Sequence, residues 1–215
     1  MDKSVSELLM EGFLKEQYDK IFCIGNGESR KDFDLERLRP LGRIYGCNAL
    51  YRDFTPDVLV AVDRGIINEI YDSGYTKDRE TWFRNTPKPG VKQVHSICPN
   101  NSDIGWACGA MAAYIGIQQT EPEEVYMIGH DFRSNDNKLN NIYKDTKNYN
   151  PSTRSPIPAT NWLHQWGTLI KDNPDIKFLK VNQTLEETDV VNTRIEEFKE
   201  YKNLEYITYE DIFSR

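Results

Sequence analysis

Residues Lys20–Gly27 read KIFCIGNG, so a short apolar run passes directly into two glycines separated by one asparagine. A run of this kind bounded by glycine is typical of a buried strand. Five similar runs follow it, at 43–47, 57–62, 92–98, 124–128 and 176–181. Helix-like pieces lie between them, at 34–38, 65–71, 102–118 and 161–171. Strands that alternate with helices predict an α/β, Rossmann-like fold with a mostly parallel central sheet flanked by helices.

The size and composition of the chain narrow the class of protein. Its 215 residues, 38% of them hydrophobic, suit one α/β domain spanning residues 1–215. The same composition excludes a disordered chain, a collagen-like fibre and a membrane bundle. A net charge of −7 argues against a protein whose whole surface binds nucleic acid or anionic lipid. Binding of nucleic acid at a local basic patch stays open, as does a homo-oligomer.

The N-terminus and the cysteines indicate a compartment. Residues 1–18 mix glutamates into an apolar pattern, which is typical of an amphipathic helix and not of a signal peptide. No run approaches the roughly 18 apolar residues that a membrane span needs. We therefore expect a cytoplasmic protein. The cysteines stand singly without a C-x-x-C pair, a pattern that favours buried reduced thiols over disulfides or zinc (Cys23, Cys47, Cys98 and Cys108).

One long segment, residues 132–160, interrupts the alternation of strands and helices. It is rich in asparagine and proline and holds five basic against two acidic residues, a net charge of +3 in an acidic chain. Irregular segments longer than about 15 residues are usually functional lids or disordered insertions. We expect a lid that closes over phosphate, with a solvated surface insertion as the alternative.

The glycine loop, residues 25–29, is the first candidate site. Glycines let the backbone approach a ligand closely, and free N–H groups in such a loop can hold phosphate oxygens. We assign Gly25, Asn26, Gly27 and Ser29 to donor binding, with an ordinary strand-ending turn as the alternative. The dinucleotide fingerprint is excluded because a third glycine is missing.

Polar residues also follow three other predicted strands. Asn48 comes after the second strand, where it can read a base or a sugar hydroxyl or act as a turn residue. Asp63 comes after the third, where it can serve the site or cap the next helix. His130 and Asp131 follow the fifth, just before the lid. Because ligands bind outside the carboxyl ends of strands in open α/β sheets, we expect these side chains to converge on one site.

Two predicted helices add to the same edge. The helix over 102–118 opens with Ser102 and Gly105, and its start can face an anion, so we assign both residues to donor binding. In the helix over 161–171, Trp162 and Trp166 lie at i and i+4 on one face. They either stack on a sugar or base or pack in the core.

These motifs resemble a known family. In order and spacing, the sequences at 25–29, 47–48, 56–63 and 129–132 resemble those of the bacterial sialyltransferases of glycosyltransferase family forty-two. They are also similar to the related domain of 6-hydroxymethylpterin diphosphokinases and flagellin-glycosylation proteins. The resemblance covers about residues 20–131 and implies a mixed α/β transferase.

The resemblance also implies roles for individual residues. Asn26 and Asn48 would contact the phosphate and ribose of a nucleotide sugar of the CMP or UDP type. Tyr143 and Tyr149 in the lid would stabilise the departing phosphate, and His164 would be the general base. No tightly bound cofactor and no metal would be required.

One residue departs from the family pattern. Glu28 stands where the family has proline, which places a negative charge beside a loop expected to bind phosphate. Repulsion there weakens phosphate binding unless Arg30 or Lys31 compensates.

The leading hypothesis is therefore a glycosyltransferase that acts on an unknown hydroxyl acceptor. For its general base we name His164 first, His130 second and Asp131 or Asp63 third. One alternative is an ATP-dependent diphosphokinase of a small alcohol, whose Mg²⁺ would need Asp63 and Asp131. Another is a nucleotide-binding module without catalysis. We interpret the D-x-D string at 32–34 as a helix cap, not as a metal site.

Overall fold

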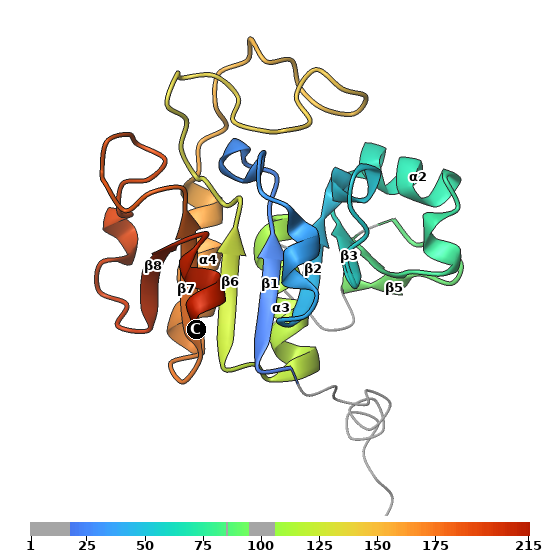
Figure 1. The fold of residues 1–215 in the computed structure, drawn as a ribbon. Coiled ribbons are helices and arrows are strands. Elements are labelled where there is room, and N and C mark those ends of the chain that lie inside the picture. The colour runs from blue at the N-terminus through green and yellow to red at the C-terminus, as the bar shows by residue number, and fades with distance from the viewer. Residues whose placement is uncertain (1–17, 85, 95–105) are drawn as a thin grey trace, which may run out of the picture.

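The eight described strands form one sheet in which every pairing is parallel, so the predicted α/β, Rossmann-like fold is confirmed (Figure 1). The structure is a computed structural model that describes residues 18–84, 86–94 and 106–215. The strand order is β5-β4-β3-β2-β1-β6-β7-β8. The bounds are β1 Lys20–Ile24, β2 Arg43–Cys47, β3 Val58–Ala61, β4 Glu80–Phe83, β5 Lys92–Gln93, β6 Glu124–Ile128, β7 Lys177–Asn182 and β8 Leu204–Thr208.

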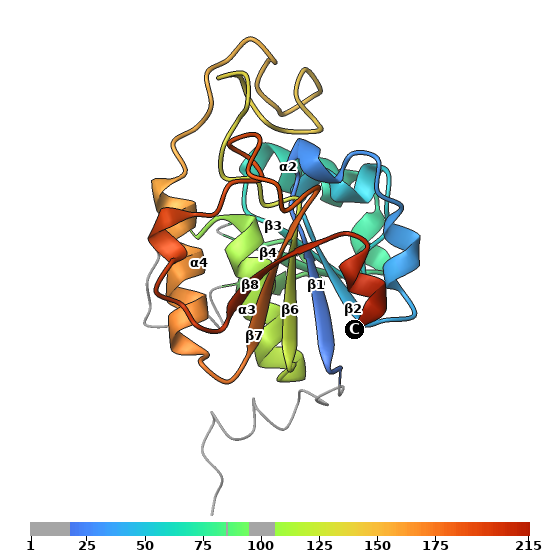
Figure 2. The same ribbon diagram turned by 60° about the vertical axis from the view of Figure 1, so that its left-hand side comes forward.

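Helices cover both faces of the sheet. Helices α3 (Cys108–Thr120) and α4 (Thr160–Asp172) lie on one face, and α2 (Arg64–Asp72) with short 3-10 turns lies on the other (Figure 2). Small residues let α3 approach closely, since a Cβ at Gly116 would lie only 2.6 Å from Ile21 Cδ1. Within the described ranges, no helix has the length and apolarity of a membrane span.

The sheet changes direction between β1 and β6. From β1 the chain moves outward through β2, β3, β4 and β5, and later returns to the other side of β1 with β6. Ligands of open α/β sheets bind in the crevice at such a switch point, outside the carboxyl ends of the strands. The two strand ends stay joined past the sheet, because Gly25 N–H donates to Ile128 O at 2.7 Å and Gly27 N–H to Gly129 O at 2.8 Å.

The elements depart from the prediction in three places. Strands β4 and β8 were not predicted, since ETWF and LEYIT are short and interrupted by polar residues. The predicted strand over 92–98 is described only as far as residue 94. The apolar spacing of residues 188–201 is typical of a helix, but only a 3-10 turn forms there, at Glu196–Phe198. The Asp189 carboxylate accepts the N–H groups of Val191 and Asn192, a local turn that competes with helix formation.

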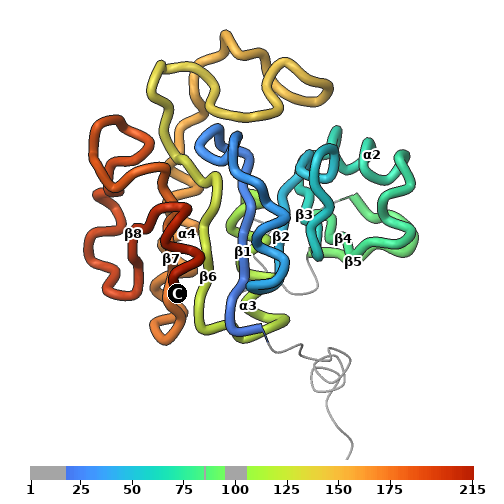
Figure 3. The backbone as a smooth tube through the Cα atoms, in the orientation of Figure 1, coloured from blue at the N-terminus to red at the C-terminus, as the bar shows by residue number. Residues whose placement is uncertain are grey.

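The lid, residues 132–160, arches over the carboxyl ends of the strands and leads into α4 (Figure 3). It is docked onto the sheet edge, since Ile142 N–H donates to Asn26 O at 2.9 Å. Arg52 fixes its far end by donating to the Thr146 hydroxyl at 2.8 Å and to Lys147 O at 2.9 Å. The same guanidinium pairs with Glu69 on α2. Specific contacts therefore hold the lid to the sheet edge and to the segment that pairs with α2.

We predict that Arg52→Ala loosens the lid. Removal of the guanidinium deletes the hydrogen bonds to Thr146 and Lys147, so trypsin should cut after Lys144 or Lys147 faster than in the wild type. The matched control is Arg39→Ala, because Arg39 also bonds a glutamate and a backbone carbonyl, Glu36 and Thr55 O, but far from the lid. Equal cleavage rates in all three proteins would show that Arg52 does not hold the lid.

Candidate active site

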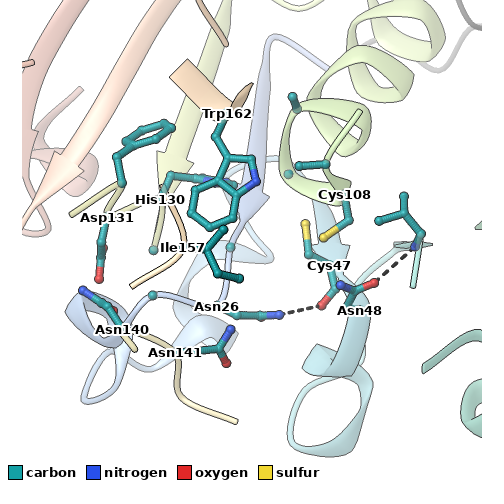
Figure 4. Close-up of a pocket in the computed structure, with 18 of the residues that line it drawn as sticks. Asn26, Cys47, Asn48, Cys108, His130, Asp131, Asn140, Asn141, Ile157 and Trp162 are labelled. Atoms are coloured by element: carbon teal, nitrogen blue, oxygen red, sulfur yellow. Dashed lines mark hydrogen bonds between the residues drawn. The ribbon is translucent and has the colours of Figure 1, made fainter. Parts of the chain in front are cut away.

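A pocket of about 510 Å³ lies at the switch point, under the lid. Its walls come from the ends of β1, β2, β3, β4 and β6, the start of α3, the start of α4 and the lid. The volume falls within the roughly 300–1,000 Å³ of ligand pockets. The structure brings together eight of the predicted site residues here: Gly25, Asn26, Gly27, Asn48, Asp63, His130, Asp131 and Tyr149. Figure 4 labels four of them, Asn26, Asn48, His130 and Asp131.

The glycine loop does not offer a phosphate cradle. The expectation that its N–H groups are free is wrong, because four of them donate within the protein. The acceptors are Ile128 O for Gly25, Gly129 O for Gly27, Asn140 Oδ1 for Glu28 and Asp131 Oδ2 for Ser29. The glycines instead permit close packing, since a Cβ at Gly27 would lie 2.4 Å from the Asp131 carboxylate.

Asp131 holds the glycine loop in place through Ser29. Its carboxylate is buried and accepts from both Ser29 N–H, at 3.0 Å, and the Ser29 hydroxyl. Lys180 on β7 is buried nearby, and burial lowers its pKa to about 8, a shift that the charge of Asp131 opposes. Both carboxylate oxygens are thus engaged with Ser29, which makes Asp131 a structural anchor and a poor general base or magnesium ligand.

The neutral imidazole ring of His130 packs between Gly25 and Gly109. A Cβ at Gly25 would lie 2.9 Å from its ring and one at Gly109 only 2.4 Å. Its Nε2 lies 3.2 Å from Cys23 O, and its ring packs edge-on against Trp166. Burial, together with the charges of Lys180 and Arg30, lowers the pKa of His130 to about 3. The ring is a weak base at neutral pH.

His164 and Tyr143 stand apart from the pocket. His164 is exposed on α4 and does not line it. Tyr143 is a buried residue of the lid that does not line the pocket; its hydroxyl donates to Asp53 and accepts from Arg30 at 3.1 Å. The predicted donor-binding residues Ser102 and Gly105 lie outside the described residues.

Tyr149 and Asn26 do face the pocket. The Tyr149 hydroxyl accepts from Asn26 Nδ2 at 3.4 Å and from Ala49 N–H at 3.3 Å. Burial raises the pKa of Tyr149 well above its usual value, so the hydroxyl keeps its proton. Asn26 Nδ2 also donates to Cys47 O at 3.3 Å, while its buried Oδ1 has no partner among the described residues.

Asn48 positions Asp63 at the mouth of the pocket. Asn48 takes the left-handed conformation (φ 49°), which asparagine adopts more readily than most residues. Its Nδ2 donates to Asp63 Oδ2 at 2.7 Å, and its Oδ1 accepts from Val62 N–H at 3.2 Å. Asp63 precedes α2 but its side chain does not cap that helix. This pair therefore presents an exposed, oriented carboxylate to the pocket.

Two further groups in the pocket were not predicted. Arg84 follows β4; its Nη1 donates to Trp106 O at 2.9 Å, and its buried Nε has no partner among the described residues. Cys108, Gly109 and Ala110 form the first turn of α3 and line the pocket. Arg84 was missed because β4 itself was missed, and the described part of α3 begins at Cys108 and not near residue 102.

The charge expectation for Glu28 needs correction, because Lys144 of the lid, at 2.8 Å, neutralises it and Arg30 or Lys31 does not. The expectation of reduced thiols is confirmed for the described cysteines, since Cys23, Cys47 and Cys108 are all free. Cys23 and Cys47 are buried and Cys108 is half-buried, and the sulfurs of Cys47 and Cys108 point toward one another (Figure 4). Cys98 lies outside the described residues. A hydrogen bond with Cys47, together with burial, raises the pKa of Cys108, so its thiol stays protonated.

A metal site is not apparent among these residues. The described part of the chain holds no group of three or more histidine, cysteine, aspartate or glutamate side chains arranged to bind a metal ion. The predicted cap at 32–34 is confirmed, since the Asp34 side chain accepts from Glu36 N–H at 3.0 Å.

Comparison with known proteins supports the fold. The chain is similar to a solved structure of the sialyltransferase CstII from Campylobacter jejuni in complex with a substrate analogue, cytidine-5′-monophosphate. The TM-score is 0.50 at 16% sequence identity, over 93% of this chain and 97% of that chain. No protein-family profile and no curated protein sequence matches the chain. The resemblance expected from the motifs is thus confirmed as a likeness of fold.

Because His130 is neutral in the folded protein, we predict that acid destabilises the fold. Its pKa falls from 6.5 to about 3 on folding, so the unfolded chain binds more protons between these values. The contribution of neutral His130 to stability should therefore be complete above pH 6.5 and be lost as the pH falls toward 3. In urea unfolding, His130→Gln should lose much less stability across this window than the wild type, whereas the exposed-site control His164→Gln should behave like the wild type. The same acid loss in His130→Gln would refute the assignment.

Proposed function

We propose that the chain is a glycosyltransferase that binds a nucleotide sugar in this pocket and transfers the sugar to a hydroxyl acceptor. The observation that carries the proposal is the convergence of polar side chains in a pocket of sufficient size at the switch point of a parallel sheet. The likeness in fold to a sialyltransferase solved with a cytidine nucleotide supports a donor of the CMP or UDP type. The reaction needs neither a metal ion nor a tightly bound cofactor.

In this proposal the donor phosphate lies at the start of α3. The first N–H groups of a helix have no acceptor within it, and the helix dipole favours an anion there. Arg84 adds a guanidinium beside Trp106, two residues before the helix begins. A buried donor without a partner, such as Arg84 Nε, costs about 1–3 kcal/mol, and a phosphate oxygen would remove that cost.

Asn26 and Tyr149 bind different parts of the donor. Because Asn26 Nδ2 is already used by Cys47 O and Tyr149, its free oxygen can only accept a hydrogen bond. It therefore suits a ribose hydroxyl and not a phosphate. The Tyr149 hydroxyl accepts two hydrogen bonds but keeps its own proton, which it can donate to the departing phosphate.

Asp63 is the general base of the proposed reaction. It takes the proton of the acceptor hydroxyl as that oxygen bonds to the sugar and the bond between sugar and phosphate oxygen breaks. Among the four candidates, His164 lies outside the pocket, His130 is a weak base and Asp131 is engaged with Ser29. Asp63 remains exposed in the pocket and oriented by Asn48.

Nucleotide binding is the first test. In a thermal-shift assay with EDTA, one of CMP, UDP, GDP or ATP at 100 times its dissociation constant should add about 2.7 kcal/mol of stability. Loss of a charge-assisted contact in Arg84→Gln should weaken binding by about 1.5–3 kcal/mol. Arg79→Gln is the matched control, because Arg79 is exposed just before β4 whereas Arg84 follows it. Binding that is unchanged in Arg84→Gln would contradict the phosphate placement.

Turnover is the second test. Turnover is measured with a panel of nucleotide sugars in EDTA. Asp63→Asn should bind the donor normally but form the nucleotide product about 10²–10⁴-fold more slowly, as expected for loss of a general base. The exposed residue Asp72 supplies the control Asp72→Asn. Binding without turnover in the wild type would instead support a non-catalytic module, and turnover of ATP that requires Mg²⁺ would support the diphosphokinase.

A further inference from the structure

Trp162 differs from the other three tryptophans of the chain. Trp82 and Trp166 are buried, the first hydrogen-bonded to Glu80 and the second packed against His130. Trp106 packs edge-on against Tyr114. Trp162 is half-buried and lines the pocket, and its indole has neither a hydrogen bond nor a ring contact with any described residue.

The indole of Trp162 projects from α4 among the side chains that line the pocket, as Figure 4 shows. Stacking on a ligand and packing in the core were the two alternatives for the tryptophans of α4, and each alternative applies to one of them. Trp166 belongs to the core, at 1% exposure, and Trp162 offers a ring face to the pocket. An aromatic face without a partner in a pocket favours a planar ligand group.

The lid and α4 contribute apolar side chains to the pocket, which we call the apolar wall: Phe132, Leu139, Pro156, Ile157 and Trp162. Ile157 is 42% exposed. Polar residues of the lid, such as Asn140 and Asn141, also line the pocket. Sugar hydroxyls need polar partners, so the apolar wall itself suits an apolar ring rather than the transferred sugar.

The polar groups proposed to act on the phosphate and the acceptor lie toward the other side of β1. Asn48, Asp63 and Arg84 follow β2, β3 and β4, whereas the lid and α4 continue from β6 and lead into β7. A donor whose phosphate and sugar occupy the polar side therefore directs its third part, the base, toward the apolar wall.

We infer that Trp162 is the stacking platform for the base of the nucleotide. This inference rests on the proposed function and adds the place of the base to it. Stacking needs only a π face, so it supplies affinity for several bases without selecting one.

The test compares ligands with and without a base. Binding of CMP, UMP, GMP and AMP, and of ribose 5-phosphate, which lacks the base, is measured by calorimetry on wild type and Trp162→Ala. For the tightest nucleotide, Trp162→Ala should weaken binding about tenfold, within the range expected for one stacked base. The affinity for ribose 5-phosphate should not change. Phe213→Ala, at an exposed aromatic residue of the last 3-10 turn, is the matched control and should change neither affinity.

A second variant distinguishes loss of stacking from misfolding of the protein. Trp162→Phe keeps a ring, so it should retain most of the nucleotide affinity while losing the change in tryptophan fluorescence that nucleotide binding causes in the wild type. Equal losses for nucleotide and ribose 5-phosphate, an undiminished fluorescence change in Trp162→Phe, or a wild type that binds both ligands equally would overturn the inference. Failure of the wild type to bind any of the four nucleotides would instead contradict the proposed function.

Discussion

The site depends on one buried contact, between the carboxylate of Asp131 and the backbone and hydroxyl of Ser29. This contact joins the end of β6 to the loop after β1, across the switch point of the sheet. It is possible only because Gly27 has no side chain above the carboxylate, and buried Lys180 balances its charge from β7. The glycines that attract attention in the sequence therefore serve packing, and they leave the crevice beside them open for a ligand.

That arrangement divides the polar residues of the pocket into two kinds. Both carboxylate oxygens of Asp131 and the Nε2 of His130 are engaged by the protein, and these residues hold strand ends together. Asp63, Tyr149 and Arg84 keep an atom or a proton that no described residue uses, and these groups face the pocket. Capacity for new hydrogen bonds, and not residue type alone, separates the side chains that can act on a ligand from those that support the site.

The sequence predicts the sheet well and the site less well. The strands around β1 follow from unbroken apolar runs ending in glycine or a polar residue, and their shared edge follows from parallel pairing. Strand β4 could not be found because its side chains alternate too little, and Arg84 was lost with it. The N–H groups of the glycine loop were expected to be free, but they donate to acceptors near the end of β6 and in the lid. Because these acceptors are far from the loop in the sequence, the sequence around the loop could not predict them. Likewise, His164 was assigned as general base only through the family resemblance, and it lies exposed on its helix.

We propose that a nucleotide enters this pocket with its phosphate at the start of α3 and not in the glycine loop. Backbone amide NMR shifts measured during titration with CMP check this placement. The largest changes should occur at Cys108, Gly109 and Ala110, with small changes at Gly27 and Ser29, whose N–H groups are already bonded within the protein. Largest changes at Gly27 and Ser29, or changes confined to residues outside the pocket, would contradict it.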